Sequence, residues 1–109
     1  MGRQALRAKN CWFIPGTAYI SEATGQYIAG KTIAFKFTSE GSNYSVVLKK
    51  DSGSSWRGTY QVGKVTGTAN AELYADGDAF VLVGRWPESG YDYTWLVHDV
   101  ELDDEDDDA

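Results

Sequence analysis

The feature that most constrains this chain is the alternation of side chains along residues 79–102. Successive side chains of a β-strand point to opposite faces, so residues of equal parity share a face. Two such sets stand on either side of a turn at residues 87–90: Phe80, Leu82 and Trp86 before it, and Tyr93, Trp95 and Val97 after it. Aromatic side chains bury large apolar areas. We therefore expect an antiparallel hairpin here, onto which the rest of the chain packs.

Similar alternating segments recur at roughly ten-residue spacing, separated by turn sequences such as Gly41-Ser42-Asn43 and Asp76-Gly77-Asp78. Residues 22–25 and 51–55 are predicted loops, and no helix of ordinary length is expected. This pattern predicts an all-β fold, a small antiparallel up-and-down barrel or curved half-barrel of about seven or eight strands. A β-sandwich is the alternative. Closure into a barrel would remove the exposed edges of such a sheet.

Charge divides the chain into three parts. Eight of its 16 acids lie in residues 99–108. The rest of the chain has eight acids and ten Lys and Arg residues and is nearly neutral. We predict a flexible basic arm at residues 1–10, a single barrel-like domain at 11–102, and a disordered acidic tail at 103–109. Such a tail keeps a protein soluble, or occupies a basic surface of a partner in place of a nucleic acid.

Composition narrows the compartment and the partners. The chain has one cysteine, Cys11, and its N-terminus lacks the apolar run of a signal peptide. No stretch approaches the roughly 20 apolar residues of a membrane span. We therefore expect a cytoplasmic protein without membrane contact. A nearly neutral body without a basic stripe also argues against nucleic-acid binding.

Motifs for catalysis or cofactor binding are weak. Residues 58–65 match a phosphate-binding loop except at Val65, where a Ser or Thr would hold magnesium, and no helix is predicted after them. Cys11 lies in an apolar run, typical of a packed thiol. His98 is the single histidine, so metal ligation lacks partners and we expect a surface side chain. We predict no metal and no cofactor.

The acids of the body leave one catalytic alternative open. Convergence of Glu72, Glu88 and Asp92 near one rim would supply the carboxylate pair of a glycosidase. The acids of residues 99–108 have no calcium-loop spacing. An enzyme is therefore the least favoured class.

Aromatic side chains are the candidate ligand contacts. The residues predicted to line a barrel cavity are Trp56, Tyr60, Phe80, Trp86, Tyr93 and Trp95. An eight-stranded barrel is just wide enough for one small ligand, although the same side chains would equally fill a solid core. Arg57 and Arg85 each adjoin a tryptophan and would extend this site by stacking on a flat ligand. Alternatively, each arginine faces solvent, because neighbouring residues face opposite ways.

Two tripeptides, Gly58-Thr59-Tyr60 and Gly84-Arg85-Trp86, resemble the Gly-x-aromatic strands of small ligand-binding barrels such as the avidins and the lipocalin relatives. The lipocalin opening Gly-x-Trp near the N-terminus is absent. The resemblance implies an architecture only, and no functional residue is carried over.

These observations favour a non-enzymatic domain that holds a small apolar or aromatic ligand inside a barrel. The alternative is a protein-interaction or inhibitor module, of viral or mobile-element kind, acting through an exposed sheet face and the acidic tail. It is motivated by Val81, Val83 and Leu96, which make the opposite face of the hairpin apolar as well. A partner protein or a second copy of the chain would cover that face.

Overall fold

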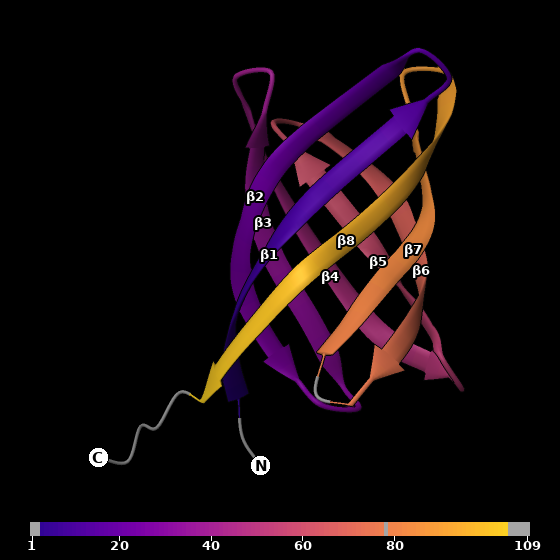
Figure 1. Ribbon diagram of the computed structural model, residues 1–109. Coiled ribbons are helices and arrows are strands. Elements are labelled where there is room, and N and C mark those ends of the chain that lie inside the picture. The colour runs from indigo at the N-terminus through magenta and orange to yellow at the C-terminus, as the bar shows by residue number, and fades with distance from the viewer. Residues whose placement is uncertain (1–2, 78, 105–109) are drawn as a thin grey trace.

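The computed structural model describes residues 3–77 and 79–104, and their regular structure is entirely β-strand. The strands are β1 (Arg3–Ile14), β2 (Thr17–Ile28), β3 (Thr32–Ser39), β4 (Ser42–Ser52), β5 (Ser55–Val62), β6 (Val65–Asp76), β7 (Ala79–Glu88) and β8 (Tyr91–Asp104). Each pairs antiparallel with the next, and β8 pairs with β1 to close the barrel (Figure 1). The predicted all-β, up-and-down barrel is confirmed, and closure excludes the half-barrel and the sandwich.

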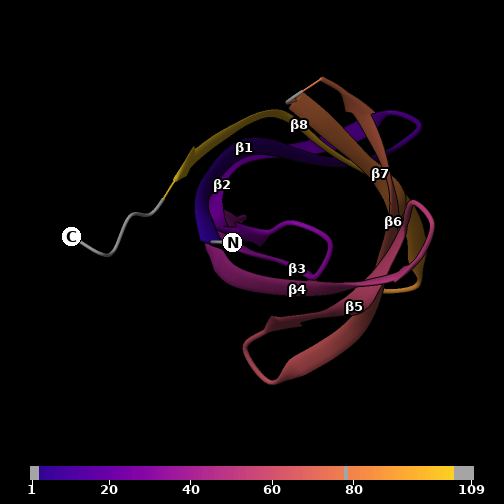
Figure 2. The same ribbon diagram turned by 90° about the horizontal axis from the view of Figure 1, so that it is seen from below.

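The two ends of the barrel differ in their connections (Figure 1). The terminal end carries the first and last strand ends together with the β2–β3, β4–β5 and β6–β7 connections. The distal end carries the other four hairpin turns. Figure 2 looks into the terminal end and shows the strands as a ring, with the last part of the chain leading away from it.

The predicted hairpin of residues 79–102 is formed by β7 and β8, with a tighter turn than expected. Only Ser89 and Gly90 lie between the strands, with φ angles of 56° and 83°. Positive φ at both central residues defines the turn whose twist matches that of paired strands. Glu88 therefore belongs to β7 and faces the same side as Trp86.

The structure differs from the predicted flexible arm at residues 1–10. From Arg3 onward this segment is the first part of β1, paired with β2 on one side and β8 on the other. Leu6, Ala8 and Asn10 are buried, and the residues between them face solvent. The sequence did not predict a strand here, because alanine and asparagine are not typical of an inward-facing side of a strand.

Two further boundaries change. The predicted loop at residues 22–25 lies within β2, where Ala23 is buried in the core. Of the predicted acidic tail, Asp103 and Asp104 form the end of β8, and residues 105–109 lie outside the described residues.

The Gly-x-aromatic tripeptides have a common structural cause. Gly58 and Gly84 face inward two residues before the inward-facing Tyr60 and Trp86. A Cβ on either glycine would overlap a carbonyl oxygen of the neighbouring strand. The strands approach closely at these positions, and only glycine permits it.

Candidate ligand-binding site

The distal half of the barrel interior is filled with aromatic rings. We call this group the distal aromatic cluster: Trp12, Tyr19, Phe37, Tyr44, Tyr60, Trp86 and Tyr93. Trp86 lies at its centre and is fully buried. Its ring stacks on Tyr60 at a centroid distance of 4.2 Å and meets Trp12 edge-on at 4.9 Å. Such close ring contacts leave no room for a ligand between them.

The polar atoms of this cluster converge on the end of β7. The Glu88 carboxylate accepts a hydrogen bond from the Trp86 indole Nε1 at 2.8 Å and another from the Tyr44 hydroxyl at 2.9 Å. The Tyr60 hydroxyl donates to the Pro87 carbonyl oxygen at 2.7 Å. Hydrogen bonds that involve a charged acceptor are stronger than neutral ones. Glu88 thus ties β4 and β7 together at the distal end.

Burial and the Glu88 charge act together on the tyrosines. The pKa of Tyr44 is raised, first by burial and then by the hydrogen bond and negative charge of Glu88. Burial, followed by the Glu88 charge, also raises the pKa of Tyr60. The pKa of Tyr93 is raised mainly by burial and then by Tyr19. These phenols therefore stay protonated well into the alkaline range.

One donor in the distal aromatic cluster lacks a partner. The Trp12 indole nitrogen is buried and has no hydrogen-bond acceptor among the described residues. An unsatisfied buried donor destabilises a fold by about 1–3 kcal/mol. The indole nitrogen of Trp86 is therefore hydrogen-bonded and that of Trp12 is not, although both rings lie in the same aromatic cluster.

A buried polar pair joins the adjacent strands β1 and β8. The Trp95 indole Nε1 donates to the Asn10 amide oxygen at 2.7 Å, and both side chains are almost fully buried. The Asn10 amide nitrogen in turn lies 3.4 Å from the Ser21 hydroxyl. This pair fixes the position of Trp95, whose ring is part of the filled core.

The predicted ligand residues therefore fall into three groups. Five of them contribute to the filled core: Trp56, Tyr60, Trp86, Tyr93 and Trp95. Arg57 and Arg85 lie on the outer wall and make exposed ion pairs, which agrees with the alternative prediction that each arginine faces solvent. Phe80 belongs to the same core and also borders a cavity near the terminal end.

The terminal end of the barrel interior is open. It holds a cavity of about 710 Å³, which we call the terminal cavity. Its lining comes from β1, β2, β6, β7, β8 and the β6–β7 turn: Gln4, Tyr27, Leu73, Ala75, Gly77, Ala79, Phe80, Val100 and Leu102. The rings of Tyr27 and Phe80 meet across the barrel at 5.1 Å, and Phe80 is buried. These rings join the terminal cavity to the filled core.

Two features of the sequence leave this end open. Pairing of β7 with β8 ends at Leu82–Val97, so the last part of β8 runs beside β1 only. The β1–β8 register shifts where Asp99 adopts a positive φ of 53°, which marks a β-bulge. In addition, three lining residues have small side chains or none: Ala75, Gly77 and Ala79.

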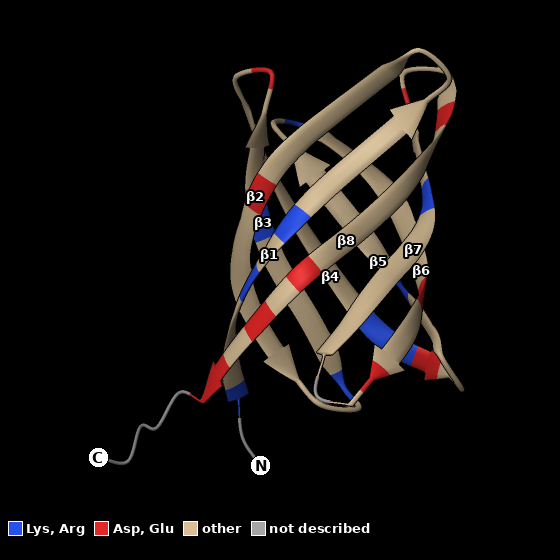
Figure 3. Ribbon diagram, in the orientation of Figure 1, with Lys and Arg blue, Asp and Glu red and all other residues tan. Residues whose placement is uncertain are grey.

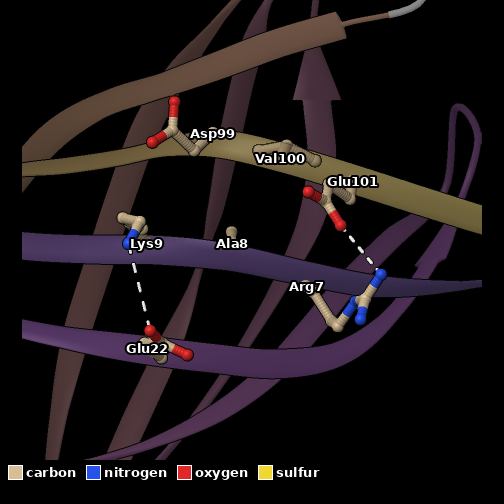
Figure 4. Close-up of a pocket in the computed structure, with 7 residues that line it drawn as sticks. All are labelled: Arg7, Ala8, Lys9, Glu22, Asp99, Val100 and Glu101. Carbon is tan, nitrogen blue, oxygen red and sulfur yellow. Dashed lines mark hydrogen bonds and ion pairs between the residues drawn. The ribbon is translucent and has the colours of Figure 1, made fainter.

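The bulge also shapes a groove of about 480 Å³ on the outer wall (Figure 4). Arg7 reaches Glu101 at 2.8 Å across it, and Lys9 reaches Glu22 at 3.9 Å. His98 lies beside it, 3.7 Å from Asp99. The charges of this groove largely neutralise one another, so it offers little to a charged ligand.

Sequence reasoning missed most of the terminal cavity. Tyr27 lies next to the end of β2, where the alternation gives little signal. Leu73 continues the inward alternation of Ala69 and Ala71, but alternation does not mark a cavity. Val100 and Leu102 carry a usable signal, because they are out of phase with the inward-facing Val97. A change of parity within one strand predicts a bulge between the two sets.

The described residues include no group of three His, Cys, Asp or Glu side chains that would hold a metal ion. Burial raises the pKa of the Cys11 thiol, which disfavours the reactive thiolate. Within the same residues, no helix has the length and apolarity needed to cross a membrane. No protein-family model matches the chain, and no curated protein matches it either.

Proposed function

We propose that this chain is a non-enzymatic binding domain that takes a small apolar ligand into the terminal cavity. The observation that carries this proposal is a cavity of about 710 Å³ with an uncharged lining that includes Tyr27, Phe80 and Leu102. Ligand pockets typically measure about 300–1,000 Å³ and are lined mainly by apolar and aromatic side chains.

The tightly packed core of the barrel supports such a role. Trp86 and Trp95 are almost completely buried, and each donates a hydrogen bond from its indole. A filled core below a half-open mouth holds the lining in place before a ligand arrives. Preorganisation of this kind raises affinity because little freedom is lost on binding.

The test is a fluorescence titration with the neutral apolar probe N-phenyl-1-naphthylamine. Ala75 lines the cavity with an exposed methyl group, so Ala75→Trp fills the cavity without removing core contacts. Thr68→Trp adds the same ring to an exposed position of the same strand. We expect saturable binding by the wild type and by T68W, with affinity at least about tenfold weaker in A75W. Equal affinities in all three proteins would refute the terminal cavity as the site.

A second candidate function rests on the outer wall. Four apolar side chains lie in one cross-strand row, which we call the outer apolar band: Ile20 on β2, Cys11 on β1, Leu96 on β8 and Val83 on β7. The Ile20 side chain is 73% exposed. Exposed apolar rows of this kind mark association surfaces, and a second copy of the chain is the partner we propose.

Light scattering separates this candidate from the first. A dimer that becomes monomeric in the Ile20→Lys and Val83→Lys double variant would support association through the outer apolar band. Val47→Lys is the matched control, since Val47 is also exposed but lies on β4, outside the band. A wild type that stays monomeric at all concentrations tested rules the second candidate out.

A further inference from the structure

We propose that the ligand of the terminal cavity is a neutral alcohol, with an apolar body inside the barrel and a hydroxyl group that donates a hydrogen bond to the Gln4 side chain. This inference rests on the proposed function, because it names the class of ligand for that same cavity. It follows from the placement of a side-chain amide in an otherwise largely apolar lining.

Gln4 lies on the inward face of β1. It has the same parity as the buried Leu6 and is itself half-buried. Its cross-strand partners are Tyr27 on β2 and Asp104 on β8. Tyr27 also lines the cavity, and its ring meets that of Phe80 at 5.1 Å. Gln4 therefore presents a polar group at the wall of a largely apolar cavity.

The amide of Gln4 has a defined orientation. Its Nε2 donates to a carboxylate oxygen of Asp104 at 3.1 Å. An ionised carboxylate only accepts hydrogen bonds, so the amide nitrogen has to face Asp104 and the amide oxygen faces away from it. An amide oxygen is an acceptor, and the ligand group that complements it is a donor. A hydroxyl group supplies such a donor without adding a charge.

The lining favours a neutral ligand. Among the described residues that line the cavity, none is Asp, Glu, Lys, Arg or His. Moving an unpaired charge from water into apolar surroundings is strongly unfavourable. Burial of a hydroxyl group costs far less when the group finds a hydrogen-bond partner, and the Gln4 amide oxygen is such a partner.

The charges around the terminal end select neither sign of ligand charge. Its strand ends and turns carry both signs: Arg3, Lys31, Lys50, Asp51, Asp76 and Asp104. Figure 3 shows basic and acidic residues interspersed around this end of the barrel. They act in opposite directions on a charged head at the mouth, and salt screens what remains. Hydrogen bonding therefore decides which polar group is preferred.

The experiment compares two isomers, decanol and methyl nonyl ether, as competitors of N-phenyl-1-naphthylamine for the full chain. The two have the same molecular formula, but only decanol has a hydroxyl donor. We expect decanol to bind about fivefold more tightly, because one hydrogen bond between neutral groups contributes modestly. Decanoate and decyltrimethylammonium, which carry opposite charges, should both bind more weakly than decanol.

Two variants assign the preference to the amide. Gln4→Met removes the amide and keeps a side chain of similar length, so the affinities of the two isomers should agree within about twofold. Gln26→Met is the matched control, because Gln26 is exposed on the outer face of β2. It should retain the fivefold preference. The measured quantity is the ratio of the two isomers within one protein, so a change in affinity for the probe cancels.

The outcomes separate this inference from the function beneath it. Wild-type affinity for the ether that equals or exceeds that for decanol overturns the alcohol and leaves the apolar site intact. The same holds for a preference that survives Gln4→Met or is lost equally in Gln26→Met, and for either ion binding more tightly than decanol. Absence of probe binding in the wild type overturns the site itself and this inference with it.

Discussion

The interior of this barrel is filled with side chains at one end and open at the other. At the distal end, rings from six strands meet around Trp86, and Glu88 accepts hydrogen bonds from two of them. At the terminal end, Ala75, Gly77 and Ala79 supply no bulk, and β8 separates from β7. A barrel of eight strands is therefore either filled or open depending on a few side chains at each end. The difference teaches that the tightly packed core lies at one end and that the proposed binding site lies at the other.

The largest expected effect is at the centre of the filled end. Trp86→Ala removes a fully buried ring and should lower the free energy of unfolding by about 3–5 kcal/mol. Tyr91→Ala is the control, because this ring is 57% exposed and its loss should cost about 0.5 kcal/mol or less. Urea denaturation monitored by circular dichroism measures both. Similar losses for the two variants would show that the distal aromatic cluster does not carry the stability.

A second pair of variants isolates the hydrogen bonds of the cluster. Trp86→Phe leaves Glu88 without its indole donor, whereas Trp12→Phe removes a donor that has no partner among the described residues. Both lose similar ring area, so Trp86→Phe should be more destabilising than Trp12→Phe by about 1–3 kcal/mol. The same denaturation experiment applies. If Trp12→Phe proves the more costly, the assignment of polar satisfaction in the cluster is wrong.

The third prediction concerns alkaline pH. Tyr44, Tyr60 and Tyr93 have raised pKa values in the folded protein, so above about pH 10 the unfolded chain releases protons that the fold retains. Stability is therefore fully present below pH 10 and falls as the pH rises above it. Tyr44→Phe should make this fall shallower, as measured by urea midpoints at a series of pH values. A wild type whose midpoint is constant between pH 9 and pH 11 contradicts the account.

The smallest effect is expected at the open end. Leu102 is only half-buried and borders the terminal cavity, so Leu102→Ala should reduce the free energy of unfolding by about 1 kcal/mol or less. Its effect on probe binding should be larger than its effect on stability. A loss comparable to that of Trp86→Ala would mean that both ends carry the fold equally.

The sequence predicted the architecture well, because inward aromatic residues alternate clearly in β7 and β8. It placed Trp86 and Trp95 correctly inside the barrel. It did not show whether the inward side chains fill the barrel or surround a cavity. Alternation gives the face on which a residue lies, but not its distance from residues across the barrel. Glu88 was assigned to a turn because Pro87 and Gly90 suggested a wider one.

The start of the barrel was missed for a related reason. The inward face of β1 uses Ala8 and Asn10, and Trp95, which donates a hydrogen bond to Asn10, lies 85 residues away in the sequence. Contacts of that kind have no local pattern. The terminal cavity also depends on such distant pairing, since its lining is assembled from both ends of the chain.

The most direct test of the account is nuclear magnetic resonance of the full chain during titration with N-phenyl-1-naphthylamine. We predict that chemical-shift changes concentrate on side chains of the terminal cavity, led by Tyr27, Phe80 and Leu102, while the indole signals of Trp12 and Trp86 stay in place. Changes centred on the distal aromatic cluster, or spread evenly over the barrel, would contradict the division between a filled end and a proposed binding end.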